Sequence, residues 1–334
     1  MARVLVCGGA GYIGSHAVRA LRRAGHAVVV LDDLSAGHAV AVPSDVPLVR
    51  AGMHEVAAVE SALARHAIDA VMHFAAWLDV GASVRDPLGY YHNNVTGSLA
   101  VLTAMQRAGV RVLVFSSTCA TYGEPERVPM DESLTPRPIN AYGETKLAIE
   151  RALPHLATAD GLRYVALRYF NAAGAEPDGS IGEDHWPEIH LIPRAIEAAT
   201  GGRPLTIFGD DYPTPDGTCL RDYIHVTDLA DAHVRALDVL MAGGASGIYN
   251  VGTGQPHSVR QVIDTVSRVV GQPVQWQMGV RREGDPSALY AASDRITQAL
   301  GWHPRHPDLE TIVQHAWAWH RSHPRGYDDR PDRP

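Results

Sequence analysis

Short apolar runs alternate with longer amphipathic stretches through the first half of the chain. Six of these runs have the length and composition of strands: residues 2–8, 26–32, 46–51, 68–75, 110–117 and 162–171. Nearly continuous apolar runs are typical of strands buried on both faces, and strands that alternate with helices form parallel sheets. The pattern therefore predicts an α/β fold whose core is a Rossmann-type, doubly wound parallel sheet.

Beyond Asn171 this alternation gives way to a stretch rich in proline and glycine. Helices are predicted near 193–200, 227–241 and 258–270, with a strand near 204–209. Such a mixed second half predicts a smaller α/β lobe folded over the carboxyl ends of the sheet strands, where ligands bind in open α/β sheets.

The expected domain boundaries follow from this change of pattern. Residues 1–170 and a return segment at about 222–245 form the first, cofactor-binding domain, and 171–221 with 246–325 form the substrate-binding lobe. The polar, proline-rich residues 326–334 predict a disordered tail.

Composition and charge exclude several classes of function. The formal charge is 29 − 37 = −8, whereas a nucleic-acid binder presents a basic surface. No apolar run approaches the roughly 18 residues that a membrane span needs. The first residues read directly as a strand and lack the regions of a signal peptide. We therefore expect a cytoplasmic protein with no nucleic-acid partner and no membrane partner.

Cysteine and histidine spacing predicts neither a disulfide framework nor a metal centre. Cys7, Cys119 and Cys219 are odd in number and far apart. The 18 histidines form no H-E-x-x-H pattern, and no cysteine pair has the spacing of zinc ligands. We expect no bound metal ion.

A glycine-rich turn, Gly8-x-x-Gly11-x-x-Gly14, joins the first predicted strand to the first predicted helix. In such turns the glycines allow the tight turn, the approach of a pyrophosphate and close helix packing, while the helix N-terminus attracts phosphate. Asp32 ends the second strand, where an acid bonds the ribose 2′-hydroxyl and rejects a 2′-phosphate. The sequence predicts NAD rather than NADP, held by Gly8, Gly11, Tyr12, Ile13, Gly14 and Asp32.

Tyr142 and Lys146 are the strongest catalytic candidates. Lys146 is the only lysine in the chain, and a lysine placed at random would follow one of the 12 tyrosines by four residues only about once in thirty trials. The i, i+4 spacing puts both side chains on one helical face. An ammonium stabilises a phenolate, so Tyr142 is predicted to act as the base with a lowered pKa. The hydroxyls of Ser116, Ser117 and Thr118, at the carboxyl end of the fifth strand, are expected over the nicotinamide.

These motifs occur in order across nearly the whole chain, together with "DAVMHFAA", "YYHNNVTGS", "LRYFNAAGA" and "RREGD". The sequence resembles the extended short-chain dehydrogenase/reductase family, and within it the epimerases that invert C4 of UDP-sugars. The resemblance implies that Tyr142 takes the proton of the sugar 4-hydroxyl, with Thr118 sharing it and Lys146 holding the nicotinamide ribose. It also implies a homodimer formed through helices of the cofactor domain.

The resemblance extends the predicted contacts. For NAD it adds Gly52, Met53, Phe74, Ala75, Ala76, Asn93, Thr118, Tyr142, Lys146, Tyr169 and Phe170. For the UDP-sugar it implies Thr118, Tyr142, Asn171, His190, Leu191, Thr206, Ile207, Phe208, Arg221, Arg282 and Asp285. The backbone around residues 206–208 would meet the uracil, and Arg221, Arg282 and Asp285 would meet the diphosphate and ribose.

The chain departs from its relatives at three positions. Gly52 and Met53 stand where many relatives have an Asp-Ile pair against the adenine, and Leu78 stands where some relatives have a lysine near the pyrophosphate. Leu289 aligns with a residue suspected of limiting the size of the sugar. UDP-glucose with UDP-galactose is the favoured substrate pair, while UDP-N-acetylglucosamine and UDP-arabinose remain open.

Two other functions compete with epimerisation. Dehydratases of the same family carry an Asp-Glu pair after the strand-end threonine, whereas Cys119 and Ala120 follow Thr118 here. Neither of these side chains can perform the acid–base step of an elimination. A non-catalytic NAD-binding regulatory module is the second alternative, although it would not need Thr118, Tyr142 and Lys146 together.

Overall fold

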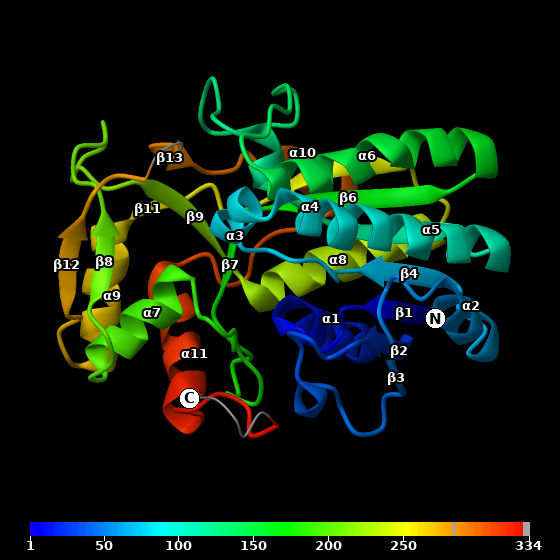
Figure 1. Ribbon diagram of the computed structural model, residues 1–334, viewed down its shortest axis with the longest axis horizontal. Helices are drawn as coiled ribbons and strands as arrows, with labels where there is room; N and C mark the ends of the chain where they lie inside the picture. The colour runs from blue at the N-terminus through cyan, green and yellow to red at the C-terminus, as the bar shows by residue number, and fades with distance from the viewer. Residues whose placement is uncertain (283–284, 330–334) are drawn as a thin grey trace.

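The computed structural model describes residues 1–282 and 285–329, and its main feature is a seven-stranded sheet (Figure 1). All of its strand pairs are parallel, in the order β10-β6-β5-β4-β1-β2-β3. The strands are β1 (Arg3–Cys7), β2 (Ala27–Asp32), β3 (Leu48–Arg50), β4 (Ala70–His73), β5 (Val112–Thr118), β6 (Arg163–Tyr169) and β10 (Gly247–Val251).

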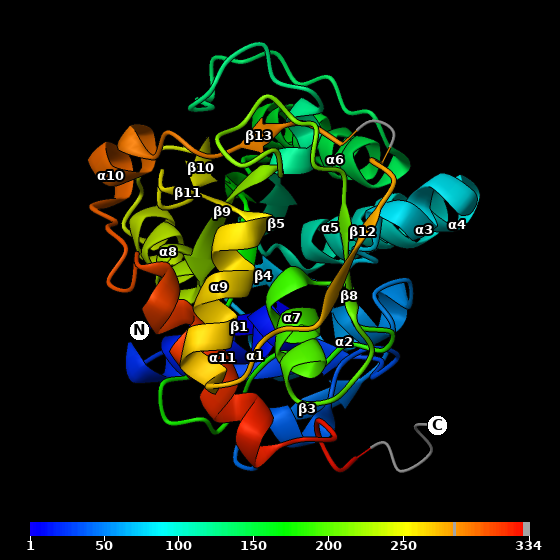
Figure 2. The ribbon, with the colours of Figure 1, turned by 90° about the vertical axis from the view of Figure 1, so that its left-hand side faces the viewer.

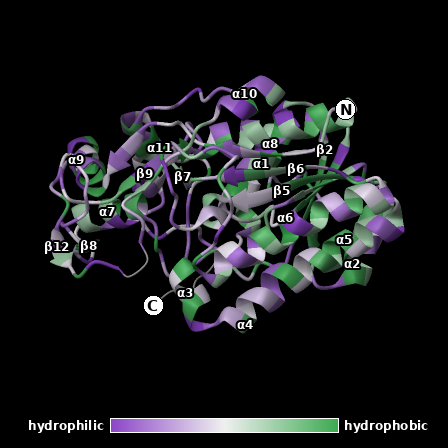
Figure 3. Cartoon of the chain, turned by 90° about the horizontal axis from the view of Figure 1, so that it is seen from above, coloured by the Kyte–Doolittle hydropathy of each residue, from purple (hydrophilic) through white to green (hydrophobic). Residues whose placement is uncertain are grey.

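Helices cover both faces of this sheet. Alternate β1 residues point to opposite faces, so Val4 and Val6 pack with α1 (Tyr12–Arg23) and α8 (Val226–Met241). Leu5 and Cys7 join the other core. That second core contains residues of α2 (Val56–Arg65), α5 (Gly97–Ala108) and α6 (Ala141–Asp160). Figure 3 shows apolar residues concentrated along the central strands and nearby helices. The predicted Rossmann-type, doubly wound α/β fold is confirmed.

The strand order shows at which edge of the sheet a ligand can bind. The chain runs from β1 outward to β2 and β3, then crosses back to β4 and continues through β5 and β6. The neighbouring strands β1 and β4 therefore form the switch point, and a crevice opens beyond their carboxyl ends. Two short helices, α3 (Val80–Arg85) and α4 (Pro87–Tyr90), follow β4 at this edge.

A smaller lobe lies over the same edge, at the left of Figure 1 and facing the viewer in Figure 2. It contains a four-stranded sheet and a separate two-stranded sheet, around which three helices pack. Its strands are β7 (Asn171–Ala173), β8 (Leu205–Phe208), β9 (Leu220–His225), β11 (Pro256–Ser258), β12 (Trp276–Gly279) and β13 (Ala288–Leu289). Its helices are α7 (Leu191–Ala199), α9 (Val259–Val270) and α11 (Leu309–Ser322).

The structure shifts two expected domain boundaries. The return segment begins at α8 rather than at residue 222, because β9 pairs with β7, β11 and β13 in the lobe. It also extends to Val251, because β10 is the edge strand of the main sheet. Further along, α10 (Asp294–Leu300) and the buried Trp302 pack in the core beneath α8 rather than in the lobe.

Residues 326–329, which were predicted to belong to a disordered tail, make defined contacts. Tyr327 is buried against Trp319, and the Asp329 Oδ1 lies 2.7 Å from the His38 Nδ1. These contacts order residues 326–329, and 330–334 lie outside the described residues. Across the described part of the chain, no helix has the length and apolar character required to cross a membrane.

Candidate active site

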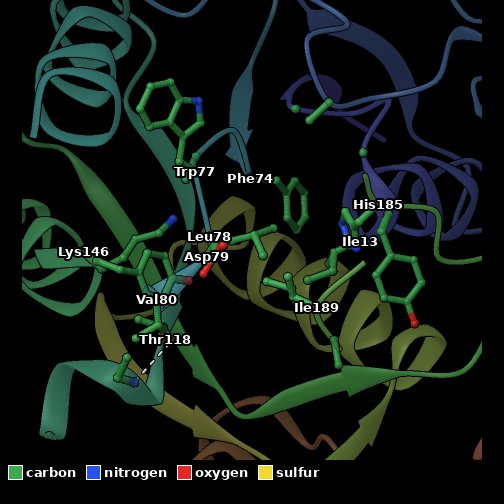
Figure 4. A pocket seen from close by; sticks show the side chains of 18 of the residues that line it. Ile13, Phe74, Trp77, Leu78, Asp79, Val80, Thr118, Lys146, His185 and Ile189 are labelled. Atoms are coloured by element: carbon green, nitrogen blue, oxygen red, sulfur yellow. Dashed lines mark hydrogen bonds between the residues drawn. The ribbon is translucent and has the colours of Figure 1, made fainter. Parts of the chain in front are cut away.

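A cavity of about 870 Å³ lies between the carboxyl ends of the main-sheet strands and the lobe. Most of the predicted site residues line it: Gly8, Gly11, Tyr12, Ile13, Gly14, Asp32, Met53, Phe74, Ala75, Ala76, Asn93, Thr118, Tyr142, Lys146, Tyr169, Phe170, Asn171, His190, Arg221, Arg282, Asp285 and Leu289. Figure 4 shows Lys146 and Thr118 on one side of this cavity and His185 across it, with Phe74 between them.

Five predicted residues do not line the cavity: Gly52, Leu191, Thr206, Ile207 and Phe208. Ile207 is buried in the lobe core, with Leu191 packed against that core. Phe208 connects to the cavity indirectly, because the Arg282 guanidinium lies 3.8 Å from the centre of its ring. The backbone of β8 therefore stands one layer behind the cavity wall.

The glycine turn has the shape that a dinucleotide needs. Gly8 has φ +79°, and a Cβ there would lie 2.6 Å from the Ala75 nitrogen. A Cβ on Gly14 would lie 2.0 Å from the Gly8 oxygen. Gly11 precedes α1 without a side-chain cap, so the first N–H groups of this helix face the cavity free to bind an anion.

Asp32 is held at the end of β2, facing the glycine turn. Its Oδ2 accepts a hydrogen bond from the Ala10 N–H and its Oδ1 accepts one from the Leu34 N–H, both at 2.9 Å. These bonds fix the carboxylate where the resemblance places a ribose. The turn and the acid together therefore fit NAD.

Helix α6 brings the catalytic pair to the cavity. The Asn140 side chain caps its start by accepting a hydrogen bond from the Gly143 N–H at 2.9 Å. Tyr142 and Lys146 follow one turn apart and are only 9% and 4% exposed. The Lys146 ammonium donates a 2.8 Å hydrogen bond to the Ser116 carbonyl at the end of β5. The helix and the strand end thus hold the lysine jointly.

The pKa values of the pair differ from the expectation for the tyrosine. Burial raises the pKa of Tyr142 well above its ordinary value, with Tyr169 adding to the rise and the hydrogen bond with Thr118 opposing it. Burial lowers the pKa of Lys146 from 10.5 to about 7, although Glu150 raises it. The predicted depression of the tyrosine pKa is wrong for the protein alone, because Lys146 bonds the Ser116 carbonyl and desolvation dominates at the phenol.

The three strand-end hydroxyls have separate roles. Thr118 lines the cavity beside Tyr142. Ser116 shares a 2.6 Å hydrogen bond with the Tyr169 hydroxyl, while Ser117 donates to Glu150. Because side chains alternate along a strand, Ser117 points to the opposite face of the sheet from the other two. The expectation that all three stand over the nicotinamide is therefore wrong for Ser117.

A buried ion pair stands behind Lys146. Glu150, one turn further along α6, accepts hydrogen bonds from Arg168 of β6, including Nε contacts of 2.9 and 3.1 Å. Both side chains are at most 5% exposed. The Arg168 guanidinium also lies 4.7 Å from the centre of the Tyr122 ring. The four-residue spacing of Tyr142, Lys146 and Glu150 places the acid on the same helical face and could be predicted from the sequence. The pairing of Glu150 with Arg168 on β6 could not.

A π-helical turn, Tyr91–Thr96, presents Asn93 to the cavity. The neighbouring Asn94 is buried and bonds both Trp77, through its backbone, and Thr145 of α6. Such turns are often found at functional sites because they re-aim side chains. Here the turn ties α6 to the loop after β4.

The lobe contributes a basic wall. Arg221 of β9 bonds Asp285, and its Nη1 donates to the Leu220 carbonyl at 2.8 Å. Arg282 stacks on Phe208, whereas its neighbour Arg281 stacks on Tyr212 and does not line the cavity. Leu289 pairs with Arg221 in the sheet and faces the same space. Two guanidinium groups are thus available for a diphosphate.

No metal ligands are expected from the sequence, yet the structure brings four suitable side chains together. Glu183, His185, Glu188 and His190 have ligand atoms that all lie within 4.8 Å of one another. Burial lowers the pKa of His190, but Glu183 and Glu188 outweigh it and raise that pKa to about 10. Burial likewise raises the pKa of Glu183, but the two histidines outweigh it and lower that pKa.

Comparison with known proteins covers nearly the whole chain. The model of the NAD dependent epimerase/dehydratase family matches residues 4–252. A UDP-glucose 4-epimerase of Halalkalibacterium halodurans is 51% identical over 325 residues, covering 97% of each chain. The crystal structure of UDP-glucose 4-epimerase from Brucella ovis with NAD is 48% identical, with a TM-score of 0.93, and the match covers 96% of this chain and 98% of that one.

A more distant structure also matches nearly the whole chain. The UDP-Glc/GlcNAc 4-epimerase of Campylobacter jejuni is 38% identical, with a TM-score of 0.84, and the match covers 96% of this chain and 100% of that one. The fold agrees with these matches. The chain therefore belongs to the NAD dependent epimerase/dehydratase family and, within it, to the UDP-glucose 4-epimerases.

Proposed function

We propose that this chain interconverts UDP-glucose and UDP-galactose by inverting C4 through a transient 4-keto sugar, with NAD as its resident cofactor. One observation carries the proposal: Thr118, Tyr142 and Lys146 line the same cavity as the glycine turn. A cofactor-binding module without catalysis would not need these three side chains together.

The residues that would hold NAD lie on the main-sheet wall. The start of α1 would bind the pyrophosphate, Asp32 the adenosine ribose and Lys146 the nicotinamide ribose. When bound, NAD supplies reversible hydride transfer at the sugar C4. At the adenine end Gly52 offers no carboxylate and Met53 would give an apolar contact, and at the pyrophosphate end Leu78 would give an apolar contact in place of a lysine.

Tyr142 would move the proton that accompanies inversion. Its phenol oxygen would take the proton from the sugar 4-hydroxyl and return it to the 4-keto oxygen after the ring turns over. The Thr118 hydroxyl would stand between phenol and sugar, and the burial of both side chains excludes water from the transfer. The high pKa of the buried phenol favours its return to the neutral form at the end of the cycle.

The buried ion pair would keep the charge of Lys146 available. Glu150 is placed one turn from Lys146, where an acid normally pairs with a lysine. Arg168 instead engages the Glu150 carboxylate from β6. The three groups carry a net charge of about +1, so the lysine ammonium is left to stabilise the phenolate and to bond the ribose. We therefore assign Arg168 and Glu150 as positioning residues.

The lobe would grip the nucleotide and leave the sugar free to turn. Arg221 and Arg282 suit a diphosphate because guanidinium forks bind phosphate oxygens in pairs. Binding energy from this remote part retains the 4-keto sugar while its ring presents the opposite face. Leu289 would set the space beside the sugar, and the choice between plain and N-acetylated hexose is assigned to this position.

We also propose a homodimer built through helices of the cofactor domain. Leu88, Tyr91 and Leu99 expose apolar side chains from α4 to α5, and Leu88 is 82% exposed. A second copy of the chain would cover them. Light scattering should give the mass of a dimer, and Leu99→Asp should shift it toward the monomer; a monomeric wild-type protein would refute this assembly.

The function is tested by incubating the purified protein with UDP-galactose without added NAD. NMR of the anomeric region should show UDP-glucose accumulating to equilibrium, and Tyr142→Phe should slow the conversion by about 10³-fold. A panel with UDP-N-acetylgalactosamine and UDP-arabinose identifies the preferred sugar. If none of the three sugars is inverted even with NAD supplied, the regulatory module becomes the better reading.

A further inference from the structure

The loop between β7 and α7 concentrates four metal-ligating side chains at one point. Glu183, His185, Glu188 and His190 follow the pattern E-x-H-x-x-E-x-H in the sequence. The nitrogen–oxygen distances between histidines and glutamates are 2.7, 3.2, 3.2 and 3.8 Å. A tetrahedral ion with ligand bonds of about 2.0–2.1 Å holds its ligand atoms about 3.3 Å apart. The four histidine–glutamate distances bracket this value, and all ligand atoms of the cluster lie within 4.8 Å of one another, so a small closing movement would bring them to the spacing of a four-coordinate site.

Two of the four ligand atoms are not accounted for by hydrogen bonds. Glu183 is 3% exposed, and its Oε1 lies 2.7 Å from the His190 Nδ1 and 3.2 Å from the His185 Nδ1 as ion-pair contacts that lack the alignment of hydrogen bonds. The Nδ1 atom of His185 is buried and lacks a hydrogen bond as well. Buried polar atoms without a hydrogen bond are uncommon in native structures and call for an explanation such as a bound ion. If the histidine nitrogens and glutamate oxygens all point at one shared ion, they lie close together without the alignment of hydrogen bonds.

We propose that Glu183, His185, Glu188 and His190 bind one divalent transition-metal ion of the zinc type. An ion that binds here displaces the proton that His190 holds between Glu183 and Glu188, and the resulting two carboxylates and two neutral imidazoles carry a charge of about −2, which balances the ion. Imidazole nitrogens favour Zn²⁺ and its neighbours, whereas Mg²⁺ and Ca²⁺ prefer oxygen ligands alone. The site goes beyond the epimerase reaction, and the proton transfer assigned to Tyr142 does not use it.

The surroundings hold the ligands in place and leave the ion a route in. One Glu188 oxygen accepts the Ile189 and His190 N–H groups at 2.8 and 2.9 Å, which fixes that carboxylate. The His185 ring packs edge-on to Tyr12, and Trp319 donates a 3.1 Å hydrogen bond to the Glu183 carbonyl. Three of the ligands line the cavity, so an ion can enter from there. A bound metal ion would thus fix the loop between β7 and α7 at the edge of the cavity.

The test measures Zn²⁺ on the NAD-containing protein after treatment with a chelator. Equilibrium dialysis against micromolar Zn²⁺ at pH 7.5, followed by elemental analysis, should give one Zn²⁺ per chain. Glu183→Gln and His185→Gln should each weaken binding about 10- to 100-fold or more. Co²⁺ in place of Zn²⁺ should give the strong visible absorption of a tetrahedral site, which both substitutions should remove.

The chain offers a matched control in a second histidine group. The Nε2 of His225 lies 2.9 Å from the Nδ1 of His315, and the His306 ring packs against both. His306→Gln should leave Zn²⁺ binding unchanged. The proposal is overturned if wild-type protein holds less than about a tenth of an equivalent, if neither loop substitution weakens binding, or if only His306→Gln does. Circular dichroism and retained NAD establish that each variant is folded, and His185→Gln with the Co²⁺ spectrum decides if Glu183→Gln does not fold.

Discussion

The two walls of the cavity are built differently. The main-sheet wall consists of strand ends and the first turns of long helices, and its reactive groups Thr118, Tyr142 and Lys146 are nearly buried. The lobe wall consists of short strands and loops, and its charged groups Arg221 and Arg282 stand partly exposed beside Leu289. Rigid elements position reacting atoms more closely than loops do. The difference indicates that chemistry belongs to the sheet wall and nucleotide binding to the lobe wall.

Removing the phenol should produce the largest effect on the sheet wall. Tyr142→Phe deletes the group that moves the proton, and general acid–base catalysis contributes about 10²–10⁴-fold. We expect kcat for UDP-galactose to fall by about 10³-fold while KM changes little. Steady-state kinetics measure both constants, and the absorbance of bound NAD serves as the control for an intact site. A fall in kcat of less than tenfold would remove Tyr142 from its role.

Breaking the Glu150–Arg168 ion pair tests its role in positioning the charge of Lys146. Removing the acid and removing the arginine should shift the alkaline limb of the pH–rate profile in opposite directions. Because Glu150 raises the pKa of Lys146, Glu150→Gln should lower it further and move the alkaline limb of the pH–rate profile to lower pH. Arg168→Met leaves the acid free to pair with Lys146, so that limb should move to higher pH, with kcat reduced about tenfold.

The double variant Arg168→Met/Glu150→Gln is the control for this pair. It removes both charges and should return the limb toward its wild-type position. Breaking a buried ion pair costs about 3–5 kcal/mol of stability, so urea unfolding must accompany the kinetics. If the alkaline limb shifts in the same direction in both single variants, Glu150 and Arg168 have only a structural role.

The lobe wall should respond in binding rather than in turnover. Arg282→Leu removes one phosphate-binding guanidinium, and a charge-assisted hydrogen bond contributes about 1.5–3 kcal/mol. We expect KM for UDP-galactose to rise about 10- to 100-fold with kcat within about threefold. Arg281→Leu is the matched control, because Arg281 stacks on Tyr212 away from the cavity. Equal effects in the two variants would mean that Arg282 has no special contact with the substrate.

The smallest predicted effect is on stability. Folding lowers the pKa of Lys146 from 10.5 to about 7, so below pH 7 both states carry the ammonium and burial costs its full amount. Between pH 7 and 10.5 the unfolded state binds more protons, so this contribution to stability rises with pH. Lys146→Met should therefore stabilise the fold by about 1–3 kcal/mol at pH 7 and by less toward pH 10.

Urea unfolding in excess NAD at both pH values measures this gain. Excess cofactor keeps the contribution of NAD binding comparable in the two proteins. A variant that is less stable than wild type at both pH values would show that the hydrogen bond to Ser116 outweighs the cost of burying the charge.

The sheet wall was largely predictable from the sequence because its signals are local. The glycine turn, Asp32 and the Tyr142–Lys146 spacing each lie within one strand, turn or helix. Glu150 shares that helical spacing, but Arg168 reaches it from another strand, and no local pattern predicts that pairing. The place of β10 was missed for a similar reason, since an edge strand reached after the lobe depends on long-range pairing.

The lobe wall was predicted less well. Thr206, Ile207 and Phe208 were expected at the ligand, but short strands do not reveal which face meets the cavity. The E-x-H-x-x-E-x-H pattern is present in the sequence, but its spacing differs from the established zinc motifs, so the sequence alone did not predict a metal site. Three consecutive hydroxyl residues were expected at the cavity. Because side chains alternate along β5, the Ser117 side chain points to the opposite face of the sheet and bonds Glu150.

The division between the two walls is tested most directly by Lys146→Arg. This change keeps the positive charge on the sheet wall but replaces a compact ammonium with a broad planar guanidinium that fits poorly between Ser116 and the phenol. The measurement is a titration with UDP-galactose on protein that retains NAD. The account predicts a fall in kcat of about a hundredfold with KM within about threefold. Near-normal turnover, or a change confined to KM, would contradict it.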